Sequence, residues 1–109
     1  MQLDEETNKK IQTLQILENN FQNVLMQKQS FQIDINESST ALEEVDKSKG
    51  DVFRVLGQIM IKADKKELKK ELMEKKDLLN LRIKSIEKQE IGMREEIERL
   101  RSEIMDKMK

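Results

Sequence analysis

The stretch DVFRVLGQIMIKAD, residues 51–64, differs from the sequence on either side of it. It consists of β-branched and other apolar residues in almost continuous runs, with Gly57 in the middle. The flanking segments are highly charged, and their apolar side chains recur every three or four positions, as they do in helices. We therefore predict two short strands, residues 52–56 and 58–62, that turn at Gly57 between two helices.

Both faces of this predicted hairpin are apolar. A period of two places its apolar side chains in two groups, one of Phe53, Val55, Ile59 and Ile61 and the other of Leu56 and Met60. An isolated two-stranded hairpin is only marginally stable in water, and its outer edges leave backbone groups unpaired. The helices carry narrow apolar stripes that cannot cover it.

We therefore expect other subunits to cover the hairpin. The alternative is a loop that folds back onto its own helices, which leaves the apolar character of both faces unexplained. The predicted assembly residues are Val52, Phe53, Val55, Leu56, Gly57, Ile59, Met60 and Ile61.

The flanking segments favour a coiled coil over a globular core. Charged residues make up 39% of the 109 residues and aromatic residues only 3%, a balance that suits either disorder or a long coiled coil. Alternating steps of four and three from Leu3 to Val45 meet an apolar side chain at nine of thirteen positions, and from Leu72 to Lys107 at eight of eleven. A 3.5-residue repeat of this length predicts two coiled-coil helices.

Four of the polar residues on this seam are expected to set the register of the helices: Lys10, Lys28, Lys76 and Glu90.

Signals for helix ends set the predicted boundaries. Asp64 with Glu67 fits an N-cap, so the second helix is expected to begin near Lys65. Gly50 fits a helix C-terminus that requires positive φ, so the first helix is expected to end within residues 46–49. The predicted single domain, residues 1–109, comprises an N-terminal helix (1–49), a hairpin (51–63) and a C-terminal helix (64–109), with the helices antiparallel.

The charge distribution agrees with that pairing. Residues 1–50 carry five Lys and Arg against nine Asp and Glu, whereas residues 65–109 carry fourteen against eleven. Two arms of opposite net charge attract each other weakly.

Several classes of function are excluded by composition. The sequence has no cysteine and no histidine, so disulfides, thiolate metal sites, cysteine nucleophiles and histidine-based triads are absent. We predict no catalytic residues, no metal and no cofactor. No apolar run reaches the ~20 residues that cross a bilayer, and the N-terminus does not resemble a signal peptide, so a cytoplasmic protein is expected.

The segment VFRVLGQIMIKADKKELKKEL, preceded by ALEEVDKSKGD and a glutamine-rich helix, resembles β-class prefoldin subunits, both the archaeal β subunit and eukaryotic subunit six. Its specific part is a helix, an aromatic–x–β-branched–x–Gly strand, a second apolar strand and a heptad helix. Phe53 stands where tyrosine is common in the family. The resemblance implies an ATP-independent chaperone that holds unfolded polypeptides and delivers them to a group II chaperonin. It also implies a hetero-hexamer of α-class subunits and further β-class copies, joined through their hairpins.

Antiparallel helices bring both chain ends together, and we call this end the tip. The family holds clients at such tips, where helices fray and methionine side chains adapt to many shapes. Leu14, Ile97 and Leu100 are expected mainly to hold the helices together. The candidate client-binding residues of the tip are Leu3, Ile11, Leu14, Ile97, Leu100, Ile104, Met105 and Met108.

Two other classes of protein compete with this interpretation. A structural coiled-coil scaffold without clients would associate along its helices and not through residues 52–62. A nucleic-acid-binding zipper would need a basic region beside the heptads, yet residues 1–10 hold two lysines against three acidic residues.

Overall fold

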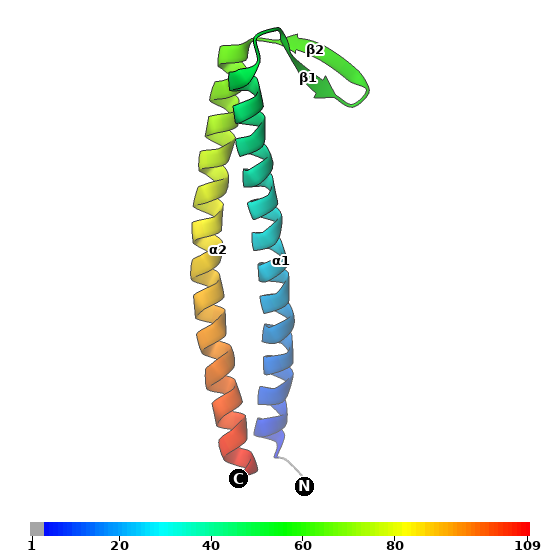
Figure 1. Ribbon diagram of the computed structural model, residues 1–109. Helices are drawn as coiled ribbons and strands as arrows, with labels where there is room; N and C mark the ends of the chain where they lie inside the picture. Colours follow the sequence, from blue (N-terminus) through cyan, green and yellow to red (C-terminus); the bar gives the residue numbers. More distant parts are fainter. Residues whose placement is uncertain (1–3) are drawn as a thin grey trace. The chain divides into compact units, whose positions relative to one another are not determined.

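A computed structural model describes residues 4–109. The order of elements is α1 (Glu5–Lys47), β1 (Val52–Leu56), β2 (Ile59–Ala63) and α2 (Lys65–Met108). Figure 1 shows the two helices and the hairpin that connects them. The chain divides into two compact units, the first formed by residues 4–29 with 84–109 and the second by residues 30–83. Each unit contains a segment of α1 beside an antiparallel segment of α2, and the second unit also contains the hairpin.

The predicted heptad seam is confirmed on both helices. Every seam position from Thr7 to Val45 on α1, and from Leu72 to Ile104 on α2, is buried or half-buried. Lys107, the last position of the predicted repeat, is exposed. The side chains that face the partner helix are therefore the ones that the 3.5-residue spacing selects.

Among residues 4–109, all the buried large apolar side chains of the core come from α2. In the first unit these are Ile86, Ile97, Leu100 and Ile104, and in the second they are Leu79 and Ile83. On α1 the buried residues are small and polar, Thr7 and Ser38, while its larger seam residues are half-buried.

Arginines from α2 cover both aromatic rings of α1, which are half-buried. The guanidinium of Arg94 lies 5.7 Å from the Phe21 ring centre, and that of Arg82 lies 5.9 Å from the Phe31 ring centre. Such cation–π contacts shield the ring faces that the narrow seam leaves open.

The N-termini of both helices are capped by aspartates. Asp64 accepts a hydrogen bond from the Lys66 N–H at 3.0 Å, and α2 begins at Lys65 as predicted. Asp4, which sequence reasoning did not single out, accepts one from the Thr7 N–H at 2.7 Å and starts α1 at Glu5.

The end of α1 differs from the prediction in one respect. The helix ends at Lys47, within the predicted range, but Gly50 does not have a positive φ. Instead, Lys65 at the start of α2 donates a hydrogen bond from Nζ to the Ser48 carbonyl at 2.6 Å. A lysine near the last carbonyls satisfies them and neutralises the negative end of the helix dipole, so a glycine cap is not needed.

The register of the hairpin corrects the predicted faces. The turn contains both Gly57 and Gln58, so β2 runs from Ile59 to Ala63 and not from 58 to 62. Directly paired residues of antiparallel strands lie on the same face, and Val55 pairs with Met60 while Leu56 pairs with Ile59. A shift of one residue moves a whole strand to the opposite face. One face therefore holds Phe53, Val55, Met60 and Lys62, and the other holds Val52, Arg54, Leu56, Ile59, Ile61 and Ala63.

The turn geometry explains the shift. Gly57 has φ +62°, and Gln58 does not have a positive φ. A two-residue loop with positive φ only at its first position is the pattern of a type II′ turn, which suits the twist of the two strands. The predicted fold class, two long antiparallel helices joined by one central β-hairpin, is confirmed.

Candidate functional site

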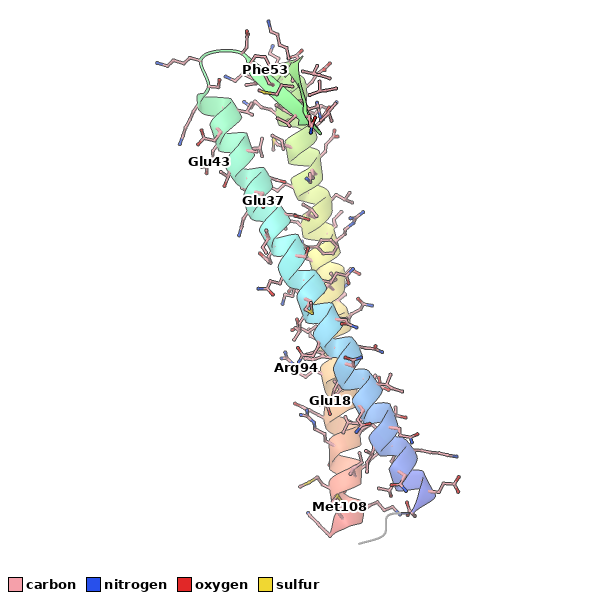
Figure 2. The ribbon with its side chains drawn as sticks, turned by 90° about the vertical axis from the view of Figure 1, so that its right-hand side faces the viewer. Glu18, Glu37, Glu43, Phe53, Arg94 and Met108 are labelled. Carbon is pink, nitrogen blue, oxygen red and sulfur yellow. The ribbon has the colours of Figure 1, made fainter. Side chains whose placement is uncertain are left out.

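The hairpin presents apolar side chains to solvent on both of its faces. On one face Phe53, Val55 and Met60 are 48%, 65% and 66% exposed. On the other face Leu56, Ile59 and Ile61 are similarly exposed. Nothing in residues 4–109 covers these side chains, and Figure 2 shows Phe53 in the hairpin beside the helix ends. The correction of the register therefore leaves the apolar character of both faces intact.

Two ion pairs tie the hairpin to its surroundings within the second unit. Arg54 on β1 lies 2.7 Å from Glu71 on α2, and Lys62 on β2 lies 3.5 Å from Asp51. Val52 and Phe53 also line an open hollow with Val45 and Leu68, where the strand leaves the helices. These contacts hold the base of the hairpin and leave its outer part free.

The described residues of the predicted tip fall into three groups by burial. Ile97, Leu100 and Ile104 are buried in the seam, and Ile11 and Leu14 are half-buried. Met105 and Met108 are 61% and 50% exposed, and Figure 2 labels Met108 in the last turn of α2. Leu3 lies outside the described residues. The tip therefore combines a packed interior with exposed methionines.

Polar contacts fasten the two helices together at the tip. Lys10 lies 3.3 Å from Glu103, and Lys107 lies 3.8 Å from Asp4. Hydrogen bonding from the side chain and backbone of Thr7 lowers the pKa of Asp4, and Lys107 lowers it further. The hydrogen bond from Lys10 lowers the pKa of Glu103, with Arg99 adding to the effect. These carboxylates are therefore ionised at neutral pH and support the helix ends that carry Met105 and Met108.

The structure also shows exposed apolar residues that the sequence reasoning did not assign. Ile16 and Met26 on α1 and Leu78 and Leu81 on α2 are each at least half exposed. All four lie outside the predicted 3.5-residue seam, and this departure from the repeat is the signal that could have singled them out.

The described residues offer little for a metal or for a membrane. Among residues 4–109, no three carboxylates gather closely enough to hold a metal ion. Neither helix in that part of the chain has a stretch long and apolar enough to cross a bilayer.

Fold and site together define a class of protein: a helical hairpin that carries an exposed apolar β-hairpin between its two helices. Known proteins share this arrangement. A crystal structure of the prefoldin beta subunit from Thermococcus strain KS-1 is similar with a TM-score of 0.85 and 25% identity, covering 96% of this chain and 94% of that one.

Sequence comparisons agree with the structural match. The chain is 38% identical over 85 residues to the prefoldin subunit beta of Pyrobaculum islandicum, covering 76% of this chain and 68% of that protein. It is 33% identical over 93 residues to the prefoldin subunit beta of Pyrococcus furiosus, covering 84% and 80%. The family described as "Prefoldin subunit" matches residues 8–109. The chain therefore belongs to the prefoldin subunit family of chaperone proteins, and the resemblance to β-class members is confirmed.

Proposed function

We propose that this chain is a subunit of an ATP-independent cytoplasmic chaperone, in which residues 1–109 act as one prefoldin-like domain. The subunit assembles through its hairpin with α-class subunits and further β-class copies into a hetero-hexamer. The assembly holds unfolded polypeptides at its tips and delivers them to a group II chaperonin.

The observation that carries the proposal is the exposure of the hairpin. Six apolar side chains, on both faces of a two-stranded sheet, are each between 48% and 66% exposed. Burial of such side chains contributes about 1.5–3 kcal/mol each when it is complete. Both outer edges of the sheet also offer unpaired backbone groups to a further strand. Strands from neighbouring subunits satisfy both requirements at once.

The tip supports the holding of clients. Because Ile97, Leu100 and Ile104 are buried in the seam, Met105 and Met108 are the predicted residues that remain most available for contact. A partly buried methionine contributes about 1–2 kcal/mol to a contact. Several tips acting on one client raise the combined affinity through effective concentration. Weak individual contacts also permit release without a nucleotide.

Assembly is tested by placing charges in the hairpin. We expect Val55→Asp/Ile61→Asp to abolish the higher oligomer, measured by light scattering with and without α-class subunits, while circular dichroism retains the helical signal. The matched control is Leu78→Asp/Leu81→Asp, which places the same charges at comparably exposed positions on α2. If the hairpin variant keeps its full oligomeric mass, the hairpin is not the joint between subunits.

Client binding is tested at the two exposed methionines. We expect Met105→Ser/Met108→Ser to preserve the oligomer and lose most of its suppression of client aggregation. Met73→Ser/Ile91→Ser is the control, because these α2 residues are 56% and 58% exposed and lie outside the predicted tip. Equal suppression by the two variants would argue against client binding at the tip and in favour of a structural scaffold.

A further inference from the structure

A stripe of exposed residues runs along α1 on the side opposite the seam. It consists of Gln12, Gln15, Ile16, Asn19, Asn23 and Met26, whose helical spacing places them on one face. We call it the amide face, because four of the six side chains end in a carboxamide. All six are exposed, and Ile16 and Met26 are 62% and 67% exposed.

The amide face has no net charge, which is unusual in this chain. Between residues 11 and 29 the charged residues are Glu18 and Lys28. Each forms an ion pair with α2, Glu18 with Arg101 at 3.5 Å and Lys28 with Glu90 at 3.1 Å. By contrast, 13 of the 25 residues 84–108 of α2 are charged. A neutral surface repels neither acidic nor basic ligands.

Helix stability does not account for the two asparagines of the amide face. Asparagine is a weaker helix former than lysine or glutamate, which together occupy 13 of the 30 exposed positions of α2. Asn19 and Asn23 lie in the interior of α1, and no hydrogen bond or ion pair of their side chains holds another part of the described chain. A residue that disfavours its helix, and that forms no contact to compensate for this, is typical of a functional surface.

The chemistry of the face suits an extended backbone. Each carboxamide offers two donors and an acceptor oxygen, so it can bond both the N–H and the C=O groups of a peptide whatever its sequence. Gln12, Gln15, Ile16 and Asn19 line a shallow hollow in which an apolar side chain could sit beside such bonds.

The size of the amide face indicates which kind of ligand it can bind. From Gln12 to Met26 the stripe is about 22 Å long and about 10 Å wide. That area is far below the roughly 800 Å² per partner of a stable protein interface, so a second copy of the chain is not expected to stay bound there. The length matches about seven residues of extended chain at about 3.3 Å each.

We propose that the amide face binds extended segments of unfolded polypeptides, of either charge, alongside α1. This inference rests on the proposed chaperone function and adds a lateral contact to the one at the tip.

Photo-crosslinking tests the proposal, because the sequence has no cysteine. Single cysteines at Asn19→Cys, Met105→Cys and Gln89→Cys carry a benzophenone, with Gln89 as an exposed amide position on the charged helix α2. The unfolded probes are reduced and alkylated α-lactalbumin, which is acidic, and reduced and alkylated lysozyme, which is basic. We expect the label at residue 19 to capture both probes severalfold better than the label at residue 89.

The outcomes separate the two proposals. Capture at residue 105 but not at 19 overturns the amide face and leaves the tip function standing. Capture at neither residue above the level at 89 overturns both.

A charge variant provides a second measurement. Gln15→Glu/Asn19→Asp keeps the shapes of the side chains but removes donors and adds negative charge. We expect it to weaken binding of the acidic probe by about fivefold, the effect of roughly one net hydrogen bond. The control Asn80→Asp/Gln89→Glu makes the same chemical change at exposed positions on α2 and should bind as the parent does. Equal affinities of the two variants would overturn the proposal.

Discussion

Lys28 and Glu90 lie on the seam at positions where a heptad repeat usually carries apolar side chains. Their charged atoms are 3.1 Å apart, and the side chains are only 31% and 14% exposed. Arg94 also lies 3.4 Å from Glu90. A partly buried pair must offset the desolvation of both charges, so its main effect is to disfavour other alignments of the helices and not to add stability.

This reasoning predicts opposite effects for single and double substitutions. Lys28→Met should lower the free energy of unfolding by about 1 kcal/mol, because Glu90 keeps its burial and loses its lysine. Lys28→Leu/Glu90→Leu should be at least as stable as the parent, since apolar residues complete the seam. Both are measured by urea denaturation at one protein concentration. Lys9→Met is the control, as the Lys9–Glu5 pair is 74% and 88% exposed and should contribute almost nothing. A loss in Lys28→Met no larger than in this control would contradict the account.

At the scale of elements, two glycines have opposite roles. Gly57 adopts φ +62° in the turn between β1 and β2, a conformation that residues with a side chain rarely accept. Gly92 lies within α2 without a positive φ, and a methyl group there would meet no atom within 4 Å. One glycine is required by its backbone, and the other only weakens a helix.

Alanine at the two positions should therefore act in opposite directions. Gly92→Ala should raise the free energy of unfolding by about 1 kcal/mol, the difference in helix propensity. Gly57→Ala should strain the turn by about 1–2 kcal/mol and weaken assembly, while the unfolding of the helices changes little. Urea denaturation and the concentration dependence of the oligomer's mass measure the two effects. A destabilised Gly92→Ala would show that α2 needs its glycine for a reason other than propensity.

At the scale of the whole molecule, ion pairs join the two helices in both units. Asp4 and Glu103 belong to the first unit and Asp46 to the second. Hydrogen bonding from Lys69 lowers the pKa of Asp46, as Thr7 does for Asp4 and Lys10 for Glu103. All three pKa values thus lie below the ordinary 3.8 of aspartate and 4.5 of glutamate.

The direction of these shifts predicts a loss of stability in acid. As the pH falls through the ordinary pKa values, these three carboxylates become protonated in the unfolded chain while they stay ionised in the folded chain. The stabilisation is therefore complete at neutral pH and disappears as the pH falls through the lowered pKa values. Thermal unfolding from pH 7 to pH 3 should show a falling midpoint, and Asp4→Asn/Asp46→Asn/Glu103→Gln should flatten the curve. Because the groups are exposed, 0.5 M salt should also flatten it. An identical slope in parent and triple variant would contradict this origin.

The sequence alone determined the features that depend on local pattern. The 3.5-residue repeat identified the seam from Thr7 to Ile104, because in a two-helix pair the spacing of apolar residues decides which side faces the partner. Asp64 marked the start of α2, since a cap acts within one helical turn. The hairpin and its flanking helices also carried the resemblance to prefoldin, and the comparisons confirm it.

Tertiary structure decided what depends on how two segments meet. The turn contains Gln58 as well as Gly57, and this one additional turn residue sets the register of the hairpin. As a result, Met60 and Ile61 each lie on the face opposite to the one that was predicted. Contacts from α2 decided that Lys65 caps α1 and that Gly50 does not. They also decided that Ile104 is buried while Met105, next to it, is exposed. The spacing of apolar residues in a segment predicts which side chains face the segment packed against it. The register and the burial of those side chains depend on the atoms of that second segment.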